Sequence, residues 1–160
     1  MNLKKNLLLI GYQKGAITNL KFCFKEIFKK KVKKLNLNYF NKSEIEKKIL
    51  NINSSRFKIL EKYRNNYQII IGSSEKKIEV NFANYCINNQ IDFFFYIDSI
   101  TNIKKRFEGL FSIPKKIICI NETISDEIKC TIKKTSYYSK IIDLKMPYQN
   151  YLKKKIFKNY

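Results

Sequence analysis

The chain has 160 residues, with 33 lysines and arginines against 13 aspartates and glutamates and no histidine, which gives a formal net charge of +20. A chain of this length buries a real core without disulfides or metals, and a hydrophobic content of 44% argues against disorder. We therefore expect one domain over residues 1–152, followed by a basic carboxyl-terminal tail over residues 153–160.

The positive charge is the first feature that suggests a function, because a basic surface is typical of nucleic-acid-binding proteins. Nearly all of this charge is lysine, however, since the only arginines are Arg56, Arg64 and Arg106. Phosphate and base recognition favours the planar, bidentate guanidinium group. Lys, Asn, Ile, Tyr and Phe are enriched together, as an AT-rich genome would encode, so we favour biased coding of solvated faces over nucleic-acid binding.

Cysteine usage argues against a metal centre. Cys23, Cys86, Cys119 and Cys130 form no C-x-x-C pair and there is no histidine, so we expect no metal and no cofactor. All four lie in apolar surroundings, which favours buried free thiols in a reducing cytoplasm. The first apolar run is about five residues, shorter than the roughly 7–15 of a signal peptide, and no segment approaches the ~20 of a membrane span. We therefore expect a cytoplasmic protein.

Short apolar runs alternate with longer amphipathic segments, as in β-α-β units around a parallel sheet. The run NLLLIGY, residues 6–12, predicts a first strand. From Ala16 the apolar residues recur at helical spacing, which predicts a helix with a basic end at Lys29–Lys34. LNLNYF, residues 35–40, predicts a weak second strand, and the capping box at residues 43–46 predicts the start of a second helix.

The middle of the chain predicts a central strand. A helical stretch around Leu60 precedes YQIII, residues 67–71, a compact apolar run that is typical of a strand buried on both faces. Gly72, Ser73 and Ser74 then form a tight turn into a helix that ends near Asn88.

The remaining elements complete an α/β fold. IDFFFYI, residues 91–97, has the strongest strand pattern in the chain, and a turn with a short helix follows over residues 99–107. Further strands are predicted at residues 116–120 and 140–144, with a helix between them that begins at the cap residue Asn121. We therefore expect a three-layer, Rossmann-like domain with a mostly parallel sheet of about six strands.

In such a sheet, ligands bind in the crevice outside the carboxyl ends of the strands. The first loop there carries Gly11 and Gly15, but it has neither the P-loop spacing nor the dinucleotide fingerprint, so the glycines are equally explained by a turn. The turn from Gly72 through Ser73 offers backbone amides to an anion, although a serine there is equally an ordinary helix cap, which we favour.

Charged residues follow the same strands. Asp98 ends the strongest strand and suits a general base or an acceptor for a sugar hydroxyl, and it equally suits a cap for the turn that follows. Arg106 can clamp an anion or pair with Asp98 across the turn. For Glu79 we favour a solvated position beside Lys76 and Lys77.

The spacing of these groups is familiar. A strand leads to a glycine-serine turn with a glutamate in the next helix, and a second strand ends in an aspartate of the pattern D-x-x-x-N-x-x-x-R-F. On this spacing, residues 67–151 resemble the amino-terminal half of a family of glycosyltransferase-like proteins of bacterial surface-polysaccharide biosynthesis, which have two Rossmann domains (the GT-B plan). The matching positions are Gly72, Ser73, Glu79, Asp98, Asn102, Arg106, Phe107, Pro114 and Glu122.

The resemblance implies a sugar or nucleotide-sugar ligand. Asp98 would be the candidate catalytic residue, and the Gly11 and Gly15 loop would line the crevice. The substrate-binding residues would be Gly72, Ser73, Glu79, Asn102, Arg106 and Glu122. The chain departs from the family where Ser99 and Ile100 occupy the positions of its histidine and tryptophan, and where Ile103 occupies that of its tyrosine.

Three functions stay open. A chain of this length corresponds to the acceptor-side half of a GT-B enzyme, in which the second domain usually binds the nucleotide-sugar donor. It is then either a glycosyltransferase-like enzyme half or a non-catalytic subunit that pairs with a separate donor-binding chain. A lysine-rich surface also suits the inner face of an anionic membrane, where each lysine contributes ~1 kcal/mol. A nucleic-acid binder with phosphate-contacting clusters at Lys29–Lys34 and Lys153–Lys155 ranks last.

Overall fold

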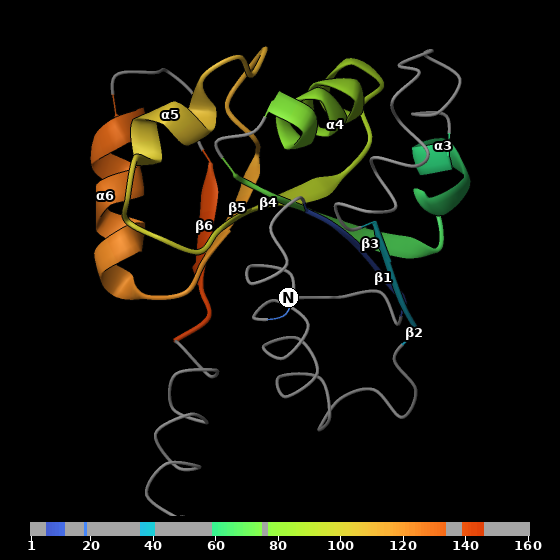
Figure 1. The fold of residues 1–160 in the computed structure, drawn as a ribbon, viewed down its shortest axis with the longest axis horizontal. Coiled ribbons are helices and arrows are strands. Elements are labelled where there is room, and N and C mark those ends of the chain that lie inside the picture. Colours follow the sequence, from blue (N-terminus) through green and yellow to red (C-terminus); the bar gives the residue numbers. More distant parts are fainter. Residues whose placement is uncertain are drawn as a thin grey trace, which may run out of the picture.

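The computed structural model describes residues 6–11, 18, 36–40, 59–74, 77–133 and 139–145. These residues form an α/β, Rossmann-like fold with a six-stranded parallel sheet, as predicted (Figure 1). The strands are β1 (Asn6–Ile10), β2 (Asn36–Phe40), β3 (Tyr67–Gly72), β4 (Phe93–Ile97), β5 (Lys116–Cys119) and β6 (Lys140–Asp143). The described helices are α3 (Ile59–Tyr63), α4 (Lys77–Asn88), α5 (Ile103–Phe107) and α6 (Glu122–Ile132).

All six predicted strands are confirmed, with ends that differ by one or two residues. The helices predicted around Leu60, from the Gly72 turn to Asn88, within residues 99–107 and after Asn121 are confirmed as well. The helices predicted from Ala16 and from the capping box at residues 43–46 lie outside the described residues, as does the basic tail.

The strand order is β2-β1-β3-β4-β5-β6, and every neighbouring pair is parallel. The chain therefore steps from β1 to β2 in one direction, passes back over β1 to β3, and continues through β4 and β5 to β6 in the other direction. The reversal between β1 and β3 is a topological switch point, the place where open α/β sheets leave a crevice at their carboxyl edge. Ile10 pairs with Ile71, so Gly11 and Gly72 leave the sheet side by side at this point.

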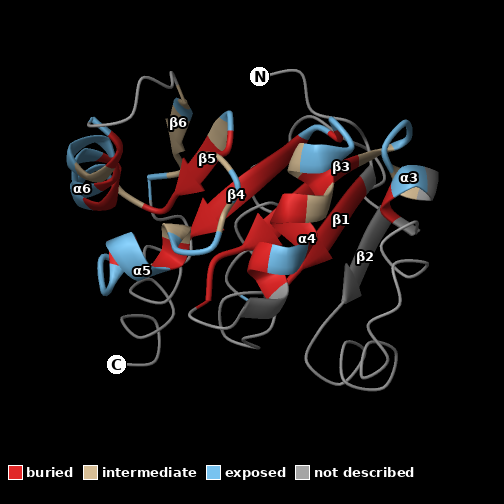
Figure 2. Ribbon diagram, turned by 90° about the horizontal axis from the view of Figure 1, so that it is seen from above, coloured by how far each residue is buried: buried red, intermediate tan, exposed pale blue. Residues whose placement is uncertain are grey.

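The core lies in the central strands. Ile69, Ile70 and Ile71 of β3 are fully buried, and all of β4 is buried from Phe93 to Ile97 (Figure 2). Strands covered on both faces lack the alternation of half-exposed strands, which explains why these segments read as continuous apolar runs. The pattern that predicted β4 is therefore the pattern of a central parallel strand.

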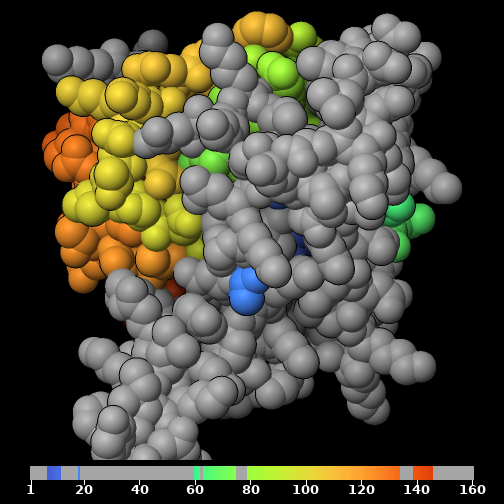
Figure 3. All heavy atoms as spheres, viewed as in Figure 1, coloured from blue at the N-terminus to red at the C-terminus, as the bar shows by residue number. Residues whose placement is uncertain are grey.

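Helix α6 covers the β5 and β6 side of the sheet and packs against α5, and the two form one side of the described surface (Figure 3). Its buried face carries Ile124, Ile128 and Ile132 at four-residue spacing. Cys130 lies two residues from Ile128, so it faces solvent. The prediction that all four cysteines are buried is therefore wrong for Cys130, although it is confirmed for Cys86 and Cys119, and Cys23 lies outside the described residues.

No helix within the described ranges is long and apolar enough to cross a membrane.

Candidate functional site

The candidate site is formed by the loops that leave β3 and β4. Gly72, the last residue of β3, pairs with Tyr96 near the end of β4. Ser73 and Asp98 therefore follow neighbouring strands at the same edge of the sheet, beside the switch point. The loop after β4 leads directly into α5.

Arg106 connects the two loops. Its Nη1 donates to Asp98 Oδ1 at 3.0 Å, to Ser73 Oγ at 3.1 Å and to the Ser73 carbonyl oxygen, while its Nε donates to the Thr101 carbonyl oxygen at 3.1 Å. The side chains of Arg106 and Asp98 are only 11% and 20% exposed. Pairing of Arg106 with Asp98, one of the two alternatives derived from the sequence, is therefore confirmed. Ser73 accepts hydrogen bonds from the same guanidinium nitrogen.

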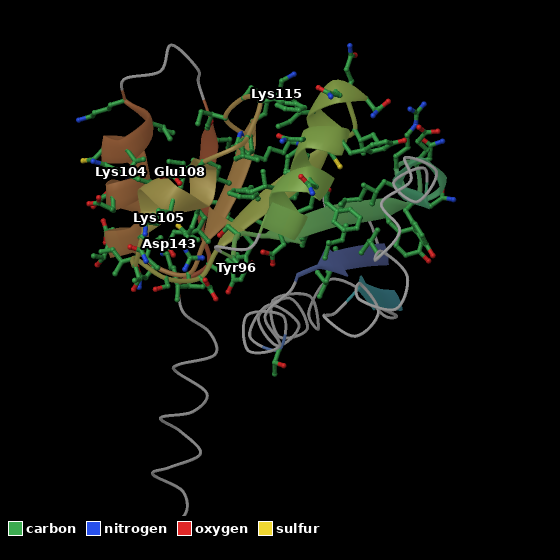
Figure 4. The ribbon with its side chains drawn as sticks, turned by 45° about the horizontal axis from the view of Figure 1, so that its top comes forward. Tyr96, Lys104, Lys105, Glu108, Lys115 and Asp143 are labelled. Atoms are coloured by element: carbon green, nitrogen blue, oxygen red, sulfur yellow. The ribbon has the colours of Figure 1, made fainter. Side chains whose placement is uncertain are left out.

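The direction of Arg106 follows from the packing of α5. The buried residues of this short helix are Ile103 and Arg106, which share one face at a spacing of three. Lys104 and Lys105 are exposed (Figure 4). The ring of Phe107 lies 5.8 Å from that of Phe95 in the core and anchors the end of the helix. The same turn of helix that packs Phe107 against the core thus brings the guanidinium group to the loops.

Asn102 makes the turn from the loop into α5. It is the helix cap residue and has φ 55° and ψ 36°, a left-handed conformation that asparagine tolerates better than most residues. Just before it, Ser99 Oγ accepts a hydrogen bond from the Thr101 amide at 3.1 Å, which closes a serine turn. Asn102 and Thr101 are exposed and Ser99 is half-buried, so this loop presents hydroxyl and amide groups at the edge of the sheet.

Glu79 lies inside the protein, with 2% exposure. Its Oε2 accepts hydrogen bonds from the Ser74 amide at 2.7 Å and from the Ser74 hydroxyl. The expectation that Glu79 is solvated is therefore wrong. It shares the spacing of Phe82, Ala83 and Cys86, the buried face of α4, and a carboxylate in the first helical turn is favoured by the helix dipole.

Gly72 allows this arrangement. A Cβ atom at Gly72 would lie 2.9 Å from Glu79 Oε1, 3.5 Å from the Ile10 carbonyl oxygen and 3.6 Å from the Gly11 Cα. The absence of a side chain lets β1, β3 and the Glu79 carboxylate approach one another. Gly11 is buried at this contact, and Gly15 lies outside the described residues.

Glu122 and Asn121 follow β5. Asn121 Oδ1 accepts from the Ile124 amide at 2.9 Å, which confirms the predicted helix cap. Glu122 is exposed in the first turn of α6. Among the described contacts, Gly72 lies against Glu79, and Arg106 bonds to both Ser73 and Asp98. Glu122 is a separate surface residue.

Asn84 is a positioning residue that the sequence did not reveal. From the middle of α4, its Nδ2 donates to the Gly109 carbonyl oxygen at 2.7 Å and its Oδ1 accepts from the Phe111 amide at 2.9 Å. These bonds hold the segment after α5 against α4. The available signal was a polar side chain on the helix face that carries Val80 and Ile87, at spacings of four and three residues.

Two cavities lie at the opposite, amino-terminal edge of the sheet. One of about 490 Å³ lies between Arg64 and residues 88–92, and one of about 430 Å³ lies between Cys86 and residues 112–115. Their charged lining residues, Arg64, Asp92 and Lys115, are exposed.

Metal ligands and reactive thiols are not part of the described site. The part of the chain that the structure describes holds no cluster of three or more His, Cys, Asp or Glu residues that would bind a metal ion. Burial raises the pKa of the Cys86 thiol to about 12 and is the main cause that raises the pKa of the Cys119 thiol to about 11. Both thiols are therefore protonated at neutral pH and are poor nucleophiles.

Comparison of the chain with protein-family models, with curated proteins and with solved structures finds no match. The likeness to glycosyltransferase-like proteins therefore stays a prediction from the spacing of residues.

Proposed function

We propose that the chain is a glycosyltransferase-like domain that binds the sugar of a sugar or nucleotide-sugar substrate during surface-polysaccharide or glycan assembly. The observation that carries this proposal is the position of the linked Ser73, Asp98 and Arg106 side chains beside the switch point between β1 and β3. Ligands of open α/β sheets bind at the carboxyl ends of the strands at such a point.

The chemistry of the β4 loop suits a sugar. Asp98 supplies a partly exposed carboxylate, and Ser99, Thr101 and Asn102 supply hydroxyl and amide groups on the same loop. These groups accept hydrogen bonds from sugar hydroxyls and donate to them. If the chain takes part in transfer, Asp98 takes the proton from the acceptor hydroxyl. The hydroxyl oxygen then bonds to the anomeric carbon of the donor sugar, and the bond from that carbon to the phosphate leaving group breaks.

A non-catalytic subunit that pairs with a separate donor-binding chain is the second candidate. Among the described residues, Ile100 and Phe111 are the large hydrophobic side chains that stand out as exposed, at 50% and 67%. Ile100 lies in the Asp98 loop, so a second chain that makes an apolar contact there would close the crevice from the other side. A transfer reaction needs both substrates held in position, and the second chain would hold the donor. Contact with an anionic membrane through Lys104 and Lys105 is compatible with either candidate.

Saturation-transfer NMR on the purified protein tests the proposal, with nucleotide sugars, free sugars and a short oligonucleotide as ligands. We expect a sugar-containing ligand to bind, and Asp98→Ala to abolish the signal. Asp92→Ala is the matched control, because Asp92 precedes the same strand at its opposite end and also pairs with a cation, Lys116 Nζ at 2.5 Å. Oligonucleotide binding that survives Asp98→Ala, with no sugar signal, would instead favour the nucleic-acid binder.

A further inference from the structure

We infer that Arg106 is a positioning residue for Asp98, and that the substrate group bound beside Asp98 is uncharged and hydroxyl-bearing rather than a phosphate or a carboxylate. The second part rests on the proposed function, because it requires a ligand in this crevice.

Two of the three guanidinium nitrogens of Arg106, Nη1 and Nε, are bonded to the protein. Its Nη1 faces three acceptors, the Asp98 carboxylate and the hydroxyl and carbonyl oxygens of Ser73, and its Nε is used by the Thr101 carbonyl oxygen. The residue is 9% exposed. An anionic ligand reaches Nη1 only by opening its bond to the Asp98 carboxylate, which is costly, so the nitrogens that face the Asp98 loop are not available to an anion.

The contacts of Arg106 fix the shape of both loops. The bonds to Ser73 hold the loop after β3, while the bonds to Asp98 and Thr101 hold the residue before the serine turn and the last residue of that turn after β4. Lysine preserves the charge but lacks the planar fork that reaches these acceptors at once. The geometry therefore depends on an arginine at this position and not on a positive charge alone.

The orientation of Asp98 sets the class of ligand. Arg106 takes Oδ1, and Oδ2 has no partner among the described residues, while the carboxylate keeps contact with solvent. An oriented carboxylate oxygen accepts hydrogen bonds from neutral hydroxyl groups, and it has no hydrogen to donate to a phosphate or carboxylate oxygen. The same loop carries the Ser99 and Thr101 hydroxyls, which are hydrogen-bonded to each other at 3.1 Å. An uncharged glycosyl moiety fits these groups, and any phosphate of the substrate binds elsewhere.

The first test needs no ligand. Amide hydrogen exchange is compared between the wild-type protein, Arg106→Lys and the control Arg64→Lys, in which the replaced arginine is exposed at the opposite edge of the sheet. We expect exchange at residues 73–74 and 98–102 to accelerate about tenfold or more in Arg106→Lys and to stay unchanged in the control. Unchanged exchange in both loops overturns the positioning role, even if the wild-type protein binds no sugar. Arg106→Gln serves in the same comparison if Arg106→Lys does not fold.

The second test uses the free sugar and the UDP sugar that bind best in the saturation-transfer panel, together with inorganic phosphate. Arg106→Lys should weaken the binding of the free sugar and of the UDP sugar by the same factor, about tenfold in Kd, and should leave phosphate binding unchanged. A loss confined to the UDP sugar or to phosphate places Arg106 on the anion and overturns the inference. If the wild-type protein binds no sugar, the proposed function and the ligand class fail together, and hydrogen exchange alone decides the role of Arg106.

Discussion

Replacing Gly72 with alanine should destabilise the protein by about 1–3 kcal/mol, the usual cost of inserting a methyl group into a tightly packed position. The added Cβ would lie 2.9 Å from Glu79 Oε1, a contact too short for unperturbed packing. Glu79 has little freedom to move away, since it is 2% exposed and its other oxygen is held by the Ser74 amide and hydroxyl. With a urea m-value of about 1–3 kcal/mol/M, the midpoint of unfolding should fall by about 1 M.

The double variant Gly72→Ala/Glu79→Ala separates the clash from other causes. If contact with Glu79 carries the cost, Gly72→Ala should destabilise the Glu79→Ala background much less than the wild-type protein, and a double-mutant cycle should show a coupling of about 0.5–3 kcal/mol. A urea midpoint that Gly72→Ala leaves unchanged would refute the close approach of β3 and Glu79. Equal losses in both backgrounds would shift the cause to the contact with Gly11.

Four further predictions concern a helix cap, a loop contact, thiol reactivity and the pH dependence of stability. Asn121→Ala should lower the free energy of unfolding by about 1 kcal/mol through the lost helix cap and lower Tm by about 2–4 °C. Asn121→Ser should restore most of this stability. Asn84→Ala should leave the Phe111 amide without its acceptor, so NMR should show faster hydrogen exchange there and an unchanged rate in β3. A thiol reagent at pH 8 should modify the exposed Cys130 well before the buried Cys86, as peptide mapping by mass spectrometry will report. Because the pKa of Cys86 is raised from 9.0 to about 12, its contribution to stability is complete below pH 9 and is lost as pH rises toward 12, which denaturation at several pH values measures.

The sequence predicted the strands well because the central strands are covered on both faces. Their apolar runs are continuous and end in residues that break strands, such as Gly72 and Asp98. The strand order could not be predicted from the sequence. Nothing local in the chain says that β3 pairs with β1 rather than with β2, since pairing depends on contacts between distant segments.

The site was predicted in part. The spacing identified four candidate residues, Gly72, Ser73, Asp98 and Arg106, and the structure places them at one edge of the sheet. It left open whether Arg106 faces a ligand or Asp98, because that is decided by the packing of α5 on the core. It misplaced Glu79, because neighbouring lysines suggested solvent whereas the buried face of α4 takes the carboxylate inward.

Chemical-shift mapping can locate the ligand site that we propose at the carboxyl edge of β3 and β4. Two-dimensional amide spectra of the ¹⁵N-labelled protein would be recorded during titration with the sugar ligand that binds best. We expect the shift changes to concentrate at residues 72–74 and 98–102. Changes that concentrate instead at residues 88–92 and 112–115, around the cavities of the amino-terminal edge, would contradict this proposal.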